Sequence, residues 1–515
     1  MKLRRKITLG LGLAAVLFAL FLTVMHFRAK GALAAYKKQL RAQGEKLTIE
    51  ELIPPKPTNG PNGAPALMEA AAQLGDCGYL LRPEMMKCVS PGRARVAWMQ
   101  PVLVSSESRN VWSHLRSGVE TNQAALAEIR SALELPILHF DVDYRSDPEQ
   151  WTSHLPALHR TMTWLSVATI HELHEGRSEA ARRDLRALTL FAAHYRGEPF
   201  LRSQYFRKGV IHMAALATWE ALQYSGWEDE KWGELQDIWR SIRVFDGVEA
   251  AFALEAAHKM ELYSKARRSD QEFYSMTQIW NPTMCEFGKA VVRDPKFGVL
   301  QLLLRLPARS LWQGWWSYEA ELWSLKRNRV SIDASREALT NGVSASAMQR
   351  MTNALGHLGE PQERFFISYE ESSESPAGTF GWFARDESLK DMVVTAIALR
   401  RFRMKHGDYP AELSMLIPGY LTELPRDFMD GKPLRYRPQE DAEFLLYSVG
   451  FDGTDNGGST TPVPGTRNDK ERGFYWLSGR DWVWPMPATA EQIEADNLEM
   501  ESYYEKYHRS RDDRD

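Results

Sequence analysis

A loop rich in carboxylates and glycines follows an apolar segment near the C-terminus. The stretch reads FLLYSVGFDGTDNGGS, residues 444–459, and holds Asp452, Asp455 and Asn456 among four glycines. Calcium takes about six to eight oxygen ligands from carboxylates, carbonyls and water, and glycines let a loop turn its carbonyls inward. The composition therefore favours a calcium-binding loop. The alternative is a solvated Asp-Gly turn without a metal.

The spacing of this loop excludes an EF-hand. That motif needs an aspartate or asparagine at its third position and a glutamate at its twelfth. Counted from Asp452, these positions hold Thr454 and Val463, and a predicted strand precedes the loop instead of a helix. A calcium site here would therefore be built by a loop that follows a strand.

Histidines and carboxylates also gather between residues 141 and 175. The segment HELHE places His171 and His174 three apart, whereas a zinc-protease helix needs two histidines four apart. His171 and Glu175 are four apart and share one face of a helix. A metal-dependent hydrolase is therefore one alternative function, and polar residues on the outer face of a helical hairpin are the other interpretation. Further ligands of such a metal would come from a neighbouring set: His154, His159, Asp141 and Asp143.

Other catalytic signatures are missing from the sequence. It has no Gly-x-Ser-x-Gly elbow, no Walker A loop, no Gly-x-Gly-x-x-Gly fingerprint and no Cys-x-x-Cys pair. The net charge of -3 argues against a general nucleic-acid binder, so we expect no nucleic-acid partner. The residues favour a protein that is not an enzyme.

The N-terminus predicts a membrane anchor. The basic segment KLRRK precedes the apolar residues 7–27, and about 20 residues at roughly 1.5 Å each match a hydrocarbon core of about 30 Å. Arg28 and Lys30 follow before any small-residue cleavage site, which favours an uncleaved signal anchor. The dense basic cluster predicts a cytoplasmic N-terminus, with the bulk of the chain on the periplasmic or extracytoplasmic side.

The three cysteines leave two possibilities open. The spacing of Cys77 and Cys88 permits a disulfide between them in an oxidising compartment. Cys285 would then be the one cysteine outside that pair. Three unpaired thiols are the alternative.

Composition divides the chain into six segments and predicts a mainly α-helical protein. An irregular helical domain occupies its centre, where TIHELHEGRSEAARRDLRALTLFAAHY resembles a tetratricopeptide-like hairpin that turns at Gly176. A small α+β module with an antiparallel sheet ends it. The segments are a signal anchor (1–30), a helix and linker (31–64), the helical domain (65–360), a linker (361–385), the α+β module (386–486) and a charged helix or tail (487–515).

A tryptophan-rich stretch lies late in the helical domain. SLWQGWWSYEAELW ends at Trp323, and four of its residues are tryptophan. Such a stretch either packs in a core or contacts a membrane surface, and the sequence favours the core.

The C-terminal module resembles the C-terminal domain of the major pseudopilin of type II secretion systems. The similarity is carried, in order, by RMKHGDYP, by YLTELPRDFMDGKPLRY and by LLYSVGFDGTDNGG. The rest of the chain resembles uncharacterised membrane-anchored multidomain proteins. The resemblance implies that Asp452 is a calcium ligand, that Val449 offers its carbonyl and that Asp481, in GRDWVW, is the second carboxylate. Asp455 and Asn456 are further candidates inside the loop.

The chain departs from that family at its N-terminus. The segment KLRRKITLGLGL has no prepilin-peptidase site, and about 350 residues separate the anchor from the module. We therefore expect no polymerisation into a pseudopilus. The sequence predicts a membrane-anchored exported scaffold or binding protein with a protein partner in the cell envelope and a calcium-stabilised module. The alternatives are the metal-dependent hydrolase and an accessory component of a type II secretion or pilus-like system.

Overall fold

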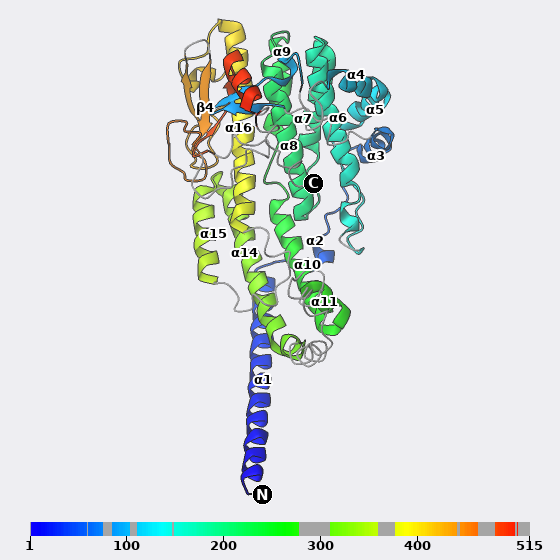
Figure 1. The fold of residues 1–515 in the computed structure, drawn as a ribbon, viewed down its shortest axis with the longest axis vertical. Coiled ribbons are helices and arrows are strands. Elements are labelled where there is room, and N and C mark those ends of the chain that lie inside the picture. Colours follow the sequence, from blue (N-terminus) through cyan, green and yellow to red (C-terminus); the bar gives the residue numbers. More distant parts are fainter. Residues whose placement is uncertain are drawn as a thin grey trace.

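The computed structural model describes residues 2–58, 60–75, 85–103, 111–146, 149–277, 309–358, 376–439, 443–461, 479–499 and 502. Figure 1 shows a long N-terminal helix that leaves the base of an array of helices, with small sheets near the opposite end. The chain is mainly α-helical, as the sequence predicts, and the described strands form two small sheets.

Helix α1 (Lys2–Ala42) is continuous but has two environments. Its later part packs on the domain, where Ala29, Leu33 and Leu40 are buried. Among the described helices, α1 alone is long and apolar enough to cross a membrane. Its earlier part exposes large apolar side chains: Leu13, Val16, Leu17, Phe18, Leu20, Phe21, Val24 and Phe27.

The helical array is built around α8 (Leu201–Leu222), in which every residue from Val210 onward is buried. The hairpin predicted at Gly176 is present between α6 and α7, and Gly176 has a φ of 71° that favours glycine. The other helices are α2 (Ile49–Leu52), α3 (Ala64–Gln73), α4 (Trp112–Thr121), α5 (Gln123–Leu133), α6 (Leu155–His174), α7 (Ser178–His194), α9 (Asp229–Ser241), α10 (Val248–Arg268), α11 (Asp270–Thr277), α14 (Ser317–Asn341) and α15 (Ala345–Leu358).

The C-terminal part is organised by one long helix. Helix α16 (Pro376–His406) lies against α8 and α9 (Figure 1). It begins ten residues before its predicted start near Asp386, so the last part of the expected linker is helical. Phe380 and Phe383 explain this difference, because both are buried and pack against Phe245. Proline is tolerated in the first turn of a helix, so Pro376 does not prevent the early start.

An antiparallel sheet follows α16, as predicted. The short η5 (Leu413–Leu416) leads to β3 (Arg435–Pro438), which pairs with β4 (Phe444–Ser448), and β4 pairs with β5 (Trp482–Val483). Strand β4 is buried along its whole length. The sheet therefore has its central strand in the core.

The module and the helical domain share one hydrophobic core. Strand β6 (Met486–Pro487) pairs in parallel with β2 (Arg93–Arg95), which is antiparallel to β1 (Lys87–Ser90). The Trp219 indole of α8 donates to the Pro485 carbonyl at 2.8 Å. A single cluster of buried apolar residues runs from Ala64 to Trp484. The two parts therefore stabilise each other.

Some predicted segments lie outside the described residues. These are linker residues 361–375 and most of the tail. In the described part of the tail, residues 490–499 form a helix. Cys77 and Cys285 also lie outside them. Cys88 has no disulfide among the described residues, and burial raises the pKa of its thiol to about 12.

Candidate functional site

Asp481 lies in the centre of the predicted calcium loop. Its carboxylate is fully buried, and the loop folds over it from β4. The backbone N–H groups of Asn456, Gly458 and Ser459 donate to Asp481 Oδ2 at 3.1, 2.8 and 3.0 Å. The glycines let these amides point inward, because Gly457 and Gly458 both have positive φ angles. The loop thus compensates the Asp481 charge with amide donors.

Asn456 joins the two carboxylates that the resemblance assigns to calcium. Its backbone N–H reaches Asp481, and its side-chain amide donates to Asp452 Oδ2 at 3.2 Å. Asp452 is exposed and accepts the Thr454 N–H at 2.9 Å. Asp455 points elsewhere, since it accepts the Tyr447 hydroxyl at 2.8 Å, and the Gly457 amide and that hydroxyl hold its pKa below the usual value.

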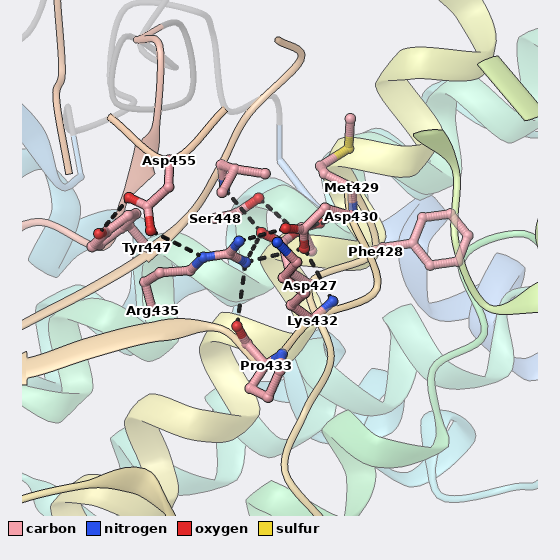
Figure 2. A network of polar contacts seen from close by, with 12 residues as sticks. Asp427, Phe428, Met429, Asp430, Lys432, Pro433, Arg435, Tyr447, Ser448 and Asp455 are labelled. Atoms are coloured by element: carbon pink, nitrogen blue, oxygen red, sulfur yellow. Dashed lines mark hydrogen bonds and ion pairs between the residues drawn. The ribbon is translucent and has the colours of Figure 1, made fainter. Parts of the chain in front are cut away.

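Asp427, which the sequence did not single out, fastens this loop to the rest of the module. Figure 2 shows its carboxylate among several donors. It accepts the N–H groups of Met429 and Val449 at 3.0 and 2.9 Å and the Ser448 hydroxyl at 2.8 Å. The Ser388 hydroxyl of α16 donates at 3.2 Å. Burial raises the pKa of Asp427, although these donors lower it in part.

Arg435 supplies the cation of this network. Its guanidinium pairs with Asp430, lies 3.3 Å from Asp427 Oδ2 and lies 3.5 Å from Asp455 Oδ2 (Figure 2). Val449, expected to offer a carbonyl to calcium, is fixed through its N–H on Asp427. The aspartates around the loop are therefore held by donors that belong to the protein itself.

The described residues contain no group of three or more His, Cys, Asp or Glu side chains placed to hold a metal. Calcium also uses backbone carbonyls and water, so the calcium site stays a prediction. Its geometric basis is the approach of Asp452 and Asp481 to the single residue Asn456.

The histidines of α6 go to separate partners. His171 is buried, and its Nε2 lies 3.1 Å from the Arg177 guanidinium. Burial lowers the pKa of His171. The His174 ring stacks on Trp112 at 3.6 Å, and its Nδ1 contacts the Trp98 carbonyl at 2.8 Å. The expectation of an outer polar face is therefore wrong for His171, which the neighbouring helices cover. Glu175, its proposed co-ligand, pairs with Arg116 at 2.7 Å.

A cleft of about 1130 Å³ lies beside the linker that follows α1. Its lining combines prolines, including Pro54 and Pro136, with apolar side chains such as Phe140, Tyr144 and Leu339. Leu339 is a large apolar residue that is 48% exposed. The walls come from five stretches far apart in the sequence: 44–57, 136–144, 194–199, 245–253 and 336–339.

A buried carboxylate supports one wall of the cleft. Glu198 accepts the Tyr195 hydroxyl at 2.9 Å and the Ser203 hydroxyl, and His154 Nε2 lies 3.0 Å from its other oxygen. Burial alone would raise the pKa of Glu198, but the His154 ring and the Ser203 hydroxyl together hold it below the usual value. Ser203 is fully buried and already engaged, so this group shapes the wall and offers no accessible nucleophile.

Ion pairs fix the opposite wall to the end of α1. The Arg336 guanidinium makes a two-point contact with Glu45 at 2.6 and 3.1 Å and reaches Glu249 at 2.7 Å. Arg329 pairs with Glu45 as well. The Arg336 hydrogen bonds lower the pKa of Glu45 to about 2. The network joins the linker to α10 and α14, so the cleft has walls that are fixed before a ligand enters.

Comparisons with known proteins gave no match. No family model, no curated protein and no solved structure matches this chain.

The cleft residues carry no signal that sequence reasoning could have used. Their stretches are short, and each alone reads as a linker, a loop or a helix end. The DFMDG segment offered a signal for Asp427, because it lies in YLTELPRDFMDGKPLRY, one of the segments on which the predicted resemblance is based. The sequence predicted a linker within residues 31–64, but not that this linker lines a cleft.

Proposed function

We propose that this protein is a membrane-anchored binding protein that holds an extended segment of a partner polypeptide in the cleft beside its proline linker. Helix α1 crosses the membrane once, and the domain lies on the extracytoplasmic side, as the basic N-terminus predicts. The cleft itself carries the proposal.

Three properties of the cleft favour this kind of ligand. Its volume of about 1130 Å³ exceeds the range of roughly 300–1,000 Å³ typical of small-molecule sites. Its apolar wall of prolines and aromatics suits the side chains of an extended chain. Its charged lining residues include Arg196 and Arg336 as well as Glu45 and Glu249, and charges of both signs suit a peptide backbone with mixed side chains.

Site-specific photocrosslinking in the cells that make the protein tests this function. The crosslinker p-benzoylphenylalanine is placed at Leu339 in the cleft or, as a control, at Glu179 on the exposed face of α7. We expect a discrete adduct from position 339 that fragments into one contiguous partner segment. Ala250→Trp fills the cleft and should abolish it. No adduct, or the same adduct from position 179, would contradict the function.

The C-terminal module adds a proposed calcium site at Asp452 and Asp481, with Asp455, Asn456 and the Val449 carbonyl as further ligands. The support is the shared contact of both carboxylates with Asn456. Calcium would close the loop and stabilise the core that the module shares with the helical domain. A role beside a type II secretion or pilus-like system would be one form of the binding function, and co-purification with pseudopilins tests it.

A further inference from the structure

The tryptophan-rich turn lies along the exposed part of α1. The π-helical turn η3 (Trp312–Trp316) precedes α14 at the base of the domain. The Trp315 and Phe21 rings meet edge to face, with centroids 5.7 Å apart. His26 contacts the Gly314 carbonyl through Nδ1, and its ring lies 5.5 Å from that of Tyr318. Figure 1 shows α1 passing the lower end of α14 before it leaves the array.

The depth of this contact follows from helix geometry. Phe21 is six residues before the end of the apolar run at Phe27, and a rise of 1.5 Å per residue puts it about 9 Å inside that end. Arg28 and Lys30, both exposed, begin the polar part of α1. Trp315 therefore lies at the level of the apolar span and below the level of these cations.

The turn presents different tryptophans to different surroundings. Trp312 is fully buried against Tyr263 and Phe273 of the domain. Trp315 and Trp316 are only half-buried. A π-helical turn adds a residue to the helix, which turns the side chains that follow it toward a different face. Here Trp312 packs inside the domain, and Trp315 contacts α1.

We propose that Trp315 and Trp316 enter the outer part of the bilayer that α1 crosses, so that the domain docks on the lipid surface. This inference rests on the membrane anchoring in the proposed function. Tryptophan is enriched at membrane interfaces, where its ring is apolar and its N–H is polar. The apolar side chains of α1 at this level, including Leu17, Leu20 and Val24, are exposed in the described structure, and acyl chains are the partner that suits them.

Docking gives the domain a fixed orientation. A domain on a single helix can rotate and tilt, whereas a second lipid contact next to the anchor restricts both motions. The ion pairs that Glu321 of α14 makes with Lys37 of α1 and Arg267 of α10 hold the same arrangement from the protein side. The cleft then lies at a fixed height. Its first residue, Gly44, is 17 residues beyond Phe27, about 25 Å above the hydrocarbon along a straight helix.

Brominated lipids test the contact in the full chain reconstituted into phosphatidylcholine vesicles. Helix α1 has no tryptophan, so the span contributes no emission. Trp280 and Trp476, the two tryptophans outside the described residues, are replaced by Phe in every sample. We compare this protein with Trp315→Phe/Trp316→Phe and with Trp382→Phe, a control on α16 that packs against Tyr205 and Lys208 of α8, far from the free end of α1 (Figure 1).

We expect bromines at the acyl-chain depth of Phe21 to quench about a tenth of the emission, and bromines near the terminal methyl groups to quench less. The double variant should lose most of this quenching, and the Trp382→Phe control should keep it. Equal quenching in all three proteins, or none in any, would overturn the inference while the anchor still holds. The anchor is tested separately, because a chain that fails to float with vesicles after carbonate extraction contradicts the proposed function. Quenching in the parent protein needs no variant, so a double variant that misfolds does not block the test.

Discussion

Replacing Asp481 with asparagine separates the two roles that its carboxylate can have. In the structure, Asp481 Oδ2 accepts three backbone N–H groups, from Asn456, Gly458 and Ser459. An asparagine oxygen can occupy the same place but has no charge. A hydrogen bond to a charged group contributes roughly 1.5–3 kcal/mol and a neutral one roughly 0.5–1.5. Three bonds that each lose about 1 kcal/mol make the loop about 3 kcal/mol less stable toward local opening.

Calcium changes this result in a way that can be calculated. If the site has the affinity of extracellular calcium modules, with a Kd of about 0.1–1 mM, then about 2 mM calcium stabilises the wild type by roughly 0.6–1.8 kcal/mol. Asp481→Asn and Asp452→Asn should both lose this gain. Without calcium, Asp452→Asn should cost at most about 0.5 kcal/mol, because Asp452 is exposed and its contacts are local.

Hydrogen–deuterium exchange of peptides covering residues 450–461 measures the opening directly. With calcium chelated, we expect exchange in Asp481→Asn to be about 100-fold faster than in the wild type, since 1.4 kcal/mol corresponds to a factor of ten. An acceleration below fivefold under chelation would refute the amide-cage reasoning. Wild-type exchange that does not slow when calcium is added would remove the calcium proposal.

Three further predictions concern buried or paired charges. Burial raises the pKa of Glu220 to about 7, so folding stability is lost as the pH rises through this range. Glu220→Gln has no such ionisation. Up to about 3 kcal/mol of the stability that the wild type loses between pH 5 and pH 8 should therefore be retained in the variant, as measured by urea unfolding at both pH values. Arg336 lowers the pKa of Glu45 to about 2, so this partly buried pair contributes above pH 4.5, and its contribution is lost as pH falls toward 2. Glu45→Gln should therefore cost about 0.5–1 kcal/mol at pH 7 and clearly less at pH 2, where Glu45 is about half protonated, by thermal unfolding at both values. His212 of α8 contacts Asp386 of α16 in the core, so Asp386→Ala and His212→Ala should couple by about 1.5–3 kcal/mol in a double-mutant cycle, and additive losses would contradict the link.

Local features were predictable where local physics decides them. The apolar run of α1 needs no neighbour to be recognised, and the turn at Gly176 follows from a residue that tolerates positive φ. The start of α16 was not predictable. Ser, Pro and Gly near residue 376 are typical of a linker. The helix forms there because Phe383 packs against Tyr205 of α8 and Phe380 packs against Phe245, which lies just before α10.

The candidate sites divide in the same way. The carboxylates and glycines of residues 450–459 were visible in the sequence, and the resemblance pointed to Asp481 across a gap of more than 20 residues. The direction of the hydrogen bonds was not visible: backbone amides turn toward Asp481, and Asp427 holds Val449. The cleft has no local signature, because its walls come from five stretches that only tertiary packing brings together.

The sequence by itself determined that one helix is apolar enough for a bilayer, that helices dominate the chain and that a loop of carboxylates and glycines follows a strand, because these depend on residues that are neighbours in the chain. Tertiary structure decided that the module and the helical domain share one core, that a proline linker lines a cleft and that Trp315 lies beside Phe21. Such relations depend on contacts between residues up to several hundred positions apart, and no local pattern records which surfaces meet when the apolar faces are buried together.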